Sequence, residues 1–227
     1  LMLAQLNLWN STGCFSEMMQ LIALQSDDYG EWLAVALMGQ GHFAAAIEVI
    51  ERLLDQDANQ QYWLALLETA LRIVDPEKHR RLFFDAVPFQ VVDLGDSVGN
   101  AELFRLNTLL EVWLNDQHCF QRAPLGQSVL DGTQTAGNLF DLSFSPLNRL
   151  WRVLEQEILS FLQTTPGFGG VYFDGRKTGG VRLESSWSIK VAELGHHVPH
   201  VHSKGWLSCV YYVSVPEAIE QRNGENE

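Results

Sequence analysis

The sequence is poor in cysteine and in basic residues, and it contains no long run of apolar residues. Its three cysteines, Cys14, Cys119 and Cys209, lie far apart and form no Cys-x-x-Cys pair of the zinc-binding kind. Scattered thiols in odd number are typical of a reducing compartment, so the sequence predicts a cytoplasmic protein. No apolar stretch reaches the roughly 20 residues that a membrane-spanning helix needs, so no membrane partner is expected.

Basic residues are outnumbered by acidic ones. Lys and Arg number 15 against 28 for Asp and Glu, which gives a formal net charge of -13. An acidic chain repels the phosphate backbone, and no run of Lys or Arg offers a local exception, so nucleic acid is not an expected partner. Hydrophobic residues make up 46% of the chain, which suffices for a buried core in one large domain or two small ones.

Residues 1 to about 85 have the apolar spacing of helices. Between Leu33 and Leu54 the apolar residues recur at three- and four-residue steps, and two glycines, Gly39 and Gly41, divide this run into two helices with a tight turn. A further helix is predicted from Gln61 to Val74, with Asp57 or Asn59 as its N-cap and its end before Pro76.

The stretch Leu33–Asp57 resembles a tetratricopeptide repeat, with small Ala34 and Ala46 where two helices approach and bulky Phe43 between them. An upstream copy is about six residues short of the usual ~34-residue period, so we interpret it as degenerate. The resemblance implies a helical-repeat domain over residues 1–85. Such a domain either binds a protein or peptide partner in its groove or serves as a helical brace for the domain that follows.

Residues 86–227 are predicted to form a second domain of mixed structure. A short strand is expected over Phe89–Leu94, and amphipathic helices over Ala101–Asp116 and Pro146–Gln163, the second capped by Ser145. The stretch between these helices, residues 117–145, is expected to be mostly loop.

Two strands are predicted in the C-terminal third of the chain. Between Val181 and Val191 apolar residues occupy the odd positions and polar residues the even ones, which is the pattern of a strand with one buried face. The stretch Trp206–Val213 is apolar on both faces and is predicted to be a central strand. Helices followed by consecutive strands predict an α+β fold with an antiparallel sheet backed by helices.

Four of the seven histidines fall between His196 and His202, next to the second predicted strand. In an extended chain, residues two apart point to the same side, so His200 and His202 can offer two imidazole nitrogens to one metal ion. Ordinary core or surface histidines, or a proton-transfer pair without metal, are the alternatives that spacing leaves open.

The sequence segments around these histidines resemble the 2-oxoglutarate/Fe(II) oxygenases found C-terminal to tetratricopeptide repeats in bacteria. The resemblance rests on Ser186–Val191 and Gly195–Val213, and on an upstream block, Gln127–Phe140. It covers roughly residues 85 to 216. It implies a double-stranded β-helix, or jelly-roll, domain that uses Fe(II) and 2-oxoglutarate as cofactors.

The resemblance implies that His200 and His202 are metal ligands. It implies that His197 either holds these ligands in place from behind or is an alternative ligand. A third ligand and a basic anchor for oxoglutarate are expected on a late strand, and since the chain stops at Glu227 we expect the domain to be incomplete. Two further residues, Lys190 and Tyr212, are candidates for binding the cosubstrate. No residue is assigned as a catalytic acid or base.

Three functions follow as hypotheses. The first is an Fe(II)/2-oxoglutarate-dependent dioxygenase with a helical-repeat region that binds a partner. The second is a non-catalytic tetratricopeptide-type adaptor whose β-domain is degenerate or binds metal structurally. The third is a cupin-like metal enzyme that does not use oxoglutarate.

Overall fold

The computed structural model describes residues 5–6, 9–10, 12–23, 29–83, 89–118, 128–165, 172, 175, 179–198, 200–202 and 204–216. Contacts along the chain divide it into two compact units, which we treat separately. Unit 1 comprises Leu1–Pro88, Gly167–Thr178 and Val201–Trp206, and unit 2 comprises Phe89–Pro166, Gly179–His200 and Leu207–Glu227. The predicted domain boundary near residue 85 stays a prediction.

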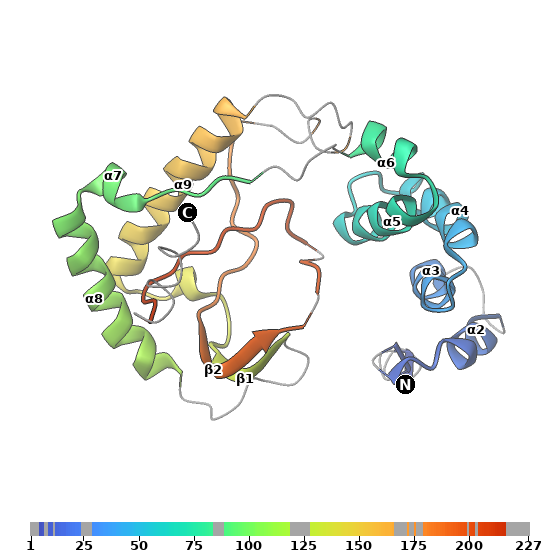
Figure 1. Ribbon diagram of the computed structural model, residues 1–227, viewed down its shortest axis with the longest axis horizontal. Helices are drawn as coiled ribbons and strands as arrows, with labels where there is room; N and C mark the ends of the chain where they lie inside the picture. The colour runs from blue at the N-terminus through green and yellow to red at the C-terminus, as the bar shows by residue number, and fades with distance from the viewer. Residues whose placement is uncertain are drawn as a thin grey trace, which may run out of the picture. The chain divides into compact units, whose positions relative to one another are not determined.

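Unit 1 is built from helices that pack each on the next (Figure 1). They are α2 (Phe15–Ala23), α3 (Gly30–Gly39), α4 (Phe43–Leu54), α5 (Gln61–Val74) and α6 (Pro76–Leu82). The predicted helix over Gln61–Val74 is therefore confirmed. Its predicted cap is wrong: Gln60 is the N-cap, and its side chain accepts a hydrogen bond of 2.7 Å from the backbone N–H of Tyr62.

The turn between α3 and α4 depends on a glycine, as the sequence predicts. Gly41 has a φ of 81°, a left-handed conformation that disfavours residues with a Cβ. Its N–H donates to the carbonyl of Met38, and the N–H of His42 donates to that of Leu37. This pair of bonds is the Schellman motif, which satisfies carbonyls at the end of a helix.

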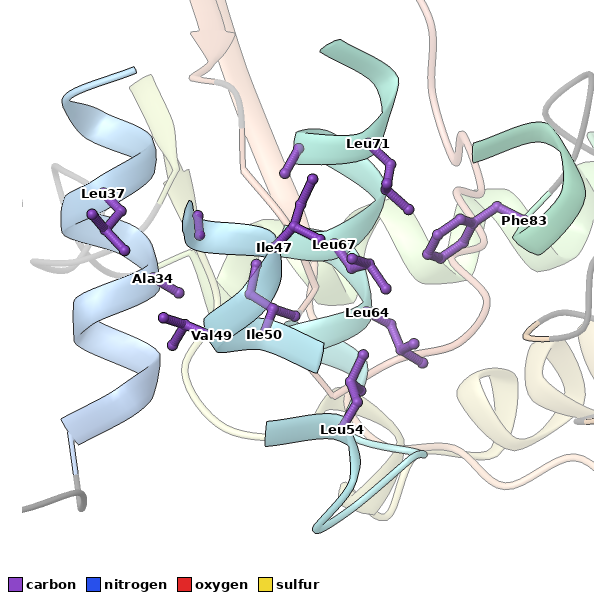
Figure 2. Close-up of a cluster of buried hydrophobic side chains, with 12 residues drawn as sticks. Ala34, Leu37, Ile47, Val49, Ile50, Leu54, Leu64, Leu67, Leu71 and Phe83 are labelled. Atoms are coloured by element: carbon purple, nitrogen blue, oxygen red, sulfur yellow. The ribbon is translucent and has the colours of Figure 1, made fainter. Parts of the chain in front are cut away.

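The core of unit 1 lies along α4. Figure 2 shows its Ile47 and Ile50 between side chains of α3 on one side and of α5 on the other. Both come from the three-residue spacing that marked this helix in the sequence. Burying a large aliphatic side chain stabilises a fold by about 1.5–3 kcal/mol, so this stripe is what holds the consecutive helices together.

The helices of unit 2 are α7 (Leu94–Val98), α8 (Asn100–Gln117) and α9 (Ser145–Thr164), and a short 3-10 helix, η2 (Leu139–Asp141), precedes the last. The two predicted amphipathic helices are confirmed as α8 and α9, with Pro146 in the first turn of α9. Phe144, rather than Ser145, holds the N-cap position. Leucines from α8 and α9 form the buried core of this unit.

The predicted strand over Phe89–Leu94 is wrong. Residues 89–93 form no strand, and Leu94 begins α7. The physical reason is an N-cap: the carboxylate of Asp93 accepts a hydrogen bond of 2.7 Å from the N–H of Gly95. That bond starts a helical turn where alternation of apolar residues had indicated a strand.

Unit 2 contains a two-stranded antiparallel sheet, β1 (Val129–Gln134) beside β2 (Ile189–His197) (Figure 1). β1 lies in the stretch that was predicted to be mostly loop. The strand predicted from Val181 begins only at Ile189, and no strand is described within residues 206–213. The strand predicted over residues 206–213 was expected at the centre of a sheet, with a neighbour on each side. The described sheet contains β1 and β2 alone.

The described residues thus give an α+β architecture, mostly helical with a small antiparallel sheet. The tetratricopeptide repeats and the double-stranded β-helix remain predictions. Among the described residues, no helix has the length and apolar character needed to cross a membrane.

Candidate metal centre

The two sequence blocks that carry the family resemblance lie side by side in unit 2. Residues of the upstream block form β1, and the stretch from Ser186 leads into β2. Just before β2, the Ser186 carbonyl accepts a 2.8 Å hydrogen bond from the N–H of Leu139, and its hydroxyl accepts one of 3.1 Å from the N–H of Phe140. The side chain of Asn138 also binds that hydroxyl. These contacts fix the start of the strand that ends in the histidines.

The β1–β2 ladder is interrupted by a bulge just before the histidines. Gly132 pairs with Val191, and Leu130 pairs with His196. Between these pairs β1 has Asp131 alone, whereas β2 has residues 192–195. Bulges of this kind re-aim the side chains that follow them and are frequent beside functional sites.

Beyond the bulge, His197 is held against the start of β1. It pairs with Val129 in the ladder, and its Nδ1 lies 2.9 Å from the hydroxyl of Ser128. The backbone continues the pairing, since the N–H of Val198 donates to the Ser128 carbonyl over 2.9 Å. His197 is therefore fixed by both its main chain and its side chain.

His200 packs its ring against that of His197. The two ring centroids are 5.4 Å apart with an interplanar angle of 31°. The Nδ1 of His200 lies 2.8 Å from the carbonyl oxygen of Val198, and because a carbonyl only accepts, this nitrogen carries the proton. In the neutral ring the lone pair is then on Nε2, which is the arrangement that metal-binding histidines commonly use.

The other two clustered histidines differ. His202 belongs to unit 1, whereas His200 belongs to unit 2. The side chain of His202 is half-buried, and its carbonyl accepts a 3.1 Å hydrogen bond from the N–H of Gly205. His196 is exposed, as are His197 and His200, and its Nδ1 lies 3.4 Å from the carbonyl of Leu194, a long contact.

The donors in this stretch are imidazole nitrogens. Imidazole suits iron, zinc, copper and nickel, and carboxylates complete the iron centres of the 2-His-1-carboxylate type. Within the described part of the chain, no three His, Cys, Asp or Glu side chains gather as a metal-binding group. The imidazoles of this stretch can therefore supply part of the ligand set of a metal ion.

The two residues predicted to bind a cosubstrate have different surroundings. Lys190 pairs with Thr133 across the sheet and donates from its ammonium to the side-chain oxygen of Asn115 at 2.7 Å. Tyr212 is 72% exposed. Its neighbour Tyr211 instead packs on the helices and hydrogen-bonds Asn107, and burial raises the pKa of its phenol above the usual value of 10.0.

His118 is a polar residue of this unit that the sequence did not single out. Its Nδ1 lies 2.8 Å from the hydroxyl of Thr133, and its Nε2 lies 3.0 Å from that of Ser188. Burial, and secondarily the charge of Lys190, lowers its pKa from 6.5. A histidine that activates a nucleophile needs a neighbour that stabilises its protonated form. The neighbours of His118 are neutral hydroxyls and the positively charged Lys190, so its contact with Ser188 is not a nucleophile-activating pair. His118 joins the end of α8 to β1 through Thr133 and to Ser188, the residue just before β2.

Gln134, the last residue of β1, and Thr135, which follows it, are both buried. Thr135 exchanges hydrogen bonds with Ser188: its hydroxyl accepts from the N–H over 3.0 Å, and its own N–H donates to the carbonyl over 3.0 Å. These bonds extend the pairing past the end of β1, which is a packing role for Thr135.

Comparison with protein-family models finds one described as "Putative 2OG-Fe(II) oxygenase", which matches residues 185–227. The matched stretch contains β2, the bulge and all the clustered histidines. No curated protein and no solved structure matches the chain.

Proposed function

We propose that the chain carries part of an Fe(II)- and 2-oxoglutarate-dependent oxygenase. The observation that carries this proposal is the family match over residues 185–227, the stretch that includes every clustered histidine. It coincides with the stretch that spacing alone marks as a source of metal ligands.

In this proposal His200 and His202 are metal ligands, and His197 either holds the ligands in place from behind or is an alternative ligand. The tautomer of His200, set by its bond to the Val198 carbonyl, supports a role for its Nε2. The ring of His197, held by Ser128, limits how the ring of His200 can turn. When bound, iron and 2-oxoglutarate supply the chemistry that oxidises a substrate with O2.

We assign Lys190 and Tyr212 to the carboxylates of the cosubstrate. Lys190 offers a charged donor, and a carboxylate bound there competes with the amide oxygen of Asn115 for the ammonium protons. Tyr212 offers an exposed phenol that donates without first breaking a contact in the core. The helical unit 1 would then bind a protein or peptide partner.

A second candidate function is a helical adaptor whose β-domain binds metal structurally or has lost the site. It is favoured by the lack of a three-donor metal group among the described residues. A cupin-like metal enzyme without oxoglutarate is the third, and it shares the imidazole donors with the first.

The test is Fe(II) binding to the full chain under anaerobic conditions, measured by calorimetry with and without 2-oxoglutarate. We expect binding that oxoglutarate strengthens, and a loss of it in His200→Ala and in His202→Ala. His196→Ala is the matched control from the same stretch, and its affinity should stay within about twofold of the parent.

Other results point to the other functions. Metal binding that oxoglutarate leaves unchanged favours the cupin-like or structural alternative. A chain that binds no Fe(II) at all, with or without oxoglutarate, contradicts the oxygenase and leaves the adaptor.

A further inference from the structure

The bulge in β2 leaves no room for a side chain at Gly195. A Cβ built on this glycine overlaps the backbone carbonyl oxygen of Asp131, approaches Cγ1 of Val191 at 2.5 Å, and lies 3.0 Å from the backbone nitrogen of Ala192. Two of these three neighbours are main-chain atoms, which no rotamer change can move away. Any larger residue at this position therefore has to shift the backbone.

The opposite strand is strained at the same point. Asp131 has a φ of 49°, in the left-handed region that residues with a Cβ adopt at a cost and that Asn, Asp and His tolerate best. Its carbonyl oxygen is the one that the Gly195 Cβ would meet. A conformation of this kind persists where surrounding contacts enforce it, and such positions cluster at functional sites.

The register on the two sides of the bulge differs, and the histidines lie on its far side. Toward the start of β2 the pairs are Gly132–Val191 and Thr133–Lys190, whereas beyond the bulge Leu130 pairs with His196 and Val129 with His197. A slip of one residue turns every following side chain to the other face of a sheet. The bulge therefore decides whether His197 reaches the Ser128 hydroxyl and the ring of His200.

We propose that Gly195 is a positioning residue of the metal centre: by permitting the tight bulge against Asp131, it sets the register that places His197 and His200 together. The inference rests on the proposed function for the metal and deepens it. Gly195 touches no metal or substrate in this role. It acts through the two imidazoles.

The test compares Gly195→Ala with Gly180→Ala in the full chain. Gly180 lies in the same unit, and a Cβ there meets no atom within 4 Å, so it is the matched control. The probe is Co(II), whose visible absorption reports imidazole coordination. We expect Gly195→Ala to weaken Co(II) binding by about 10- to 100-fold, as changes behind metal ligands do, and Gly180→Ala to match the parent.

A second readout follows the register without metal. In nuclear magnetic resonance the parent should show cross-strand contacts between Val129 and His197, and an Nδ1 shift at His197 from its bond to Ser128. Gly195→Ala should lose both while the signals of α8 and α9 persist. If these cross-strand signals survive in Gly195→Ala, the positioning role is refuted, whatever the metal does.

The two readouts separate the two proposals. If the parent binds no metal but Gly195→Ala still loses the register signals, the proposed function fails and the bulge inference stands. If Gly195→Ala fails to fold, the double variant Asp131→Gly/Gly195→Ala decides. Glycine at 131 relaxes the strained backbone that must move, so this variant should recover the Val129–His197 contacts at least in part, and no recovery overturns the inference.

Discussion

The two units differ in how far apart along the chain their contacts lie. In unit 1 each helix packs on its sequence neighbour, so Ile50 on α4 lies between α3 and α5. In unit 2 the polar contacts join distant segments, as when His118 meets Ser188. Contacts of the second kind need a long loop to close before they stabilise anything.

The fold of unit 1 is determined by contacts between helices that are neighbours in the sequence, which suits a scaffold or partner-binding region. The candidate metal centre depends on pairing between β1 and β2, whose residues are joined through α9. Its geometry is therefore sensitive to changes in register that leave the helices intact.

The largest expected effect is in the core of unit 1. Leu67 on α5 is 1% exposed, and Leu67→Ala should lower the free energy of unfolding by about 2–5 kcal/mol, because it leaves a cavity. Urea denaturation followed by circular dichroism measures this loss. Ile73 on the same helix is 57% exposed, so Ile73→Ala should cost about 0.5 kcal/mol or less. Equal losses would mean that α5 does not bury the face described here.

The second effect tests packing where α2 meets α3. A methyl group on Gly39 would overlap the ring of Phe15, so Gly39→Ala should destabilise unit 1 by about 1–3 kcal/mol despite the higher helix propensity of alanine. Thermal unfolding by circular dichroism gives the change. The double variant Gly39→Ala/Phe15→Leu removes the ring and should recover part of the loss. A more stable Gly39→Ala would show that the ring moves freely.

The same contrast explains what the sequence could predict. The helix at Gln61–Val74 was predicted to the residue, because its apolar period and the following Pro76 are local signals. The strand over Val129–Gln134 was missed, since its residues, with a glycine at 132 and polar neighbours, have little strand character by themselves. It becomes a strand by pairing with a segment far along the chain.

The candidate site was predictable in part for the same reason. Spacing singled out His200 and His202, and the family resemblance added His197. The structure brings the rings of His197 and His200 together. His118 has no such signal, because its partners Thr133 and Ser188 are distant in sequence. The bulge at Gly195 was also out of reach, since it depends on the backbone of Asp131 in the other strand.

A third prediction concerns acid, and it should distinguish the units. The pKa of His118 lies below 6.5 in the folded chain, from burial and then from the charge of Lys190. As the pH falls below about 6.5, the unfolded chain therefore binds a proton before the folded chain does, and the free energy of unfolding decreases. The decrease stops below the folded pKa, where both states are protonated.

Urea denaturation at about pH 7.5 and about pH 5.5 measures this effect. His118→Gln should lose less stability between the two pH values than the parent does. The matched control for the loss of one histidine is His42→Gln, at an exposed position in unit 1. Identical pH dependence in all three proteins would mean that His118 does not resist protonation.

The smallest effect is expected from the ion pair that links α8 to α9. Arg149 donates from Nε and Nη2 to one carboxylate oxygen of Glu102, at 2.9 Å and 2.7 Å. Both side chains are 47% exposed, so water and salt screen the attraction. A cycle of Arg149→Gln, Glu102→Gln and the double variant should give a coupling of about 0.2–1 kcal/mol that falls as salt is added. A coupling energy as large as the cost of Leu67→Ala would mean that unit 2 is stabilised by charge where unit 1 is stabilised by apolar burial. The two units would then differ in the kind of interaction as well as in how far apart along the chain their contacts lie.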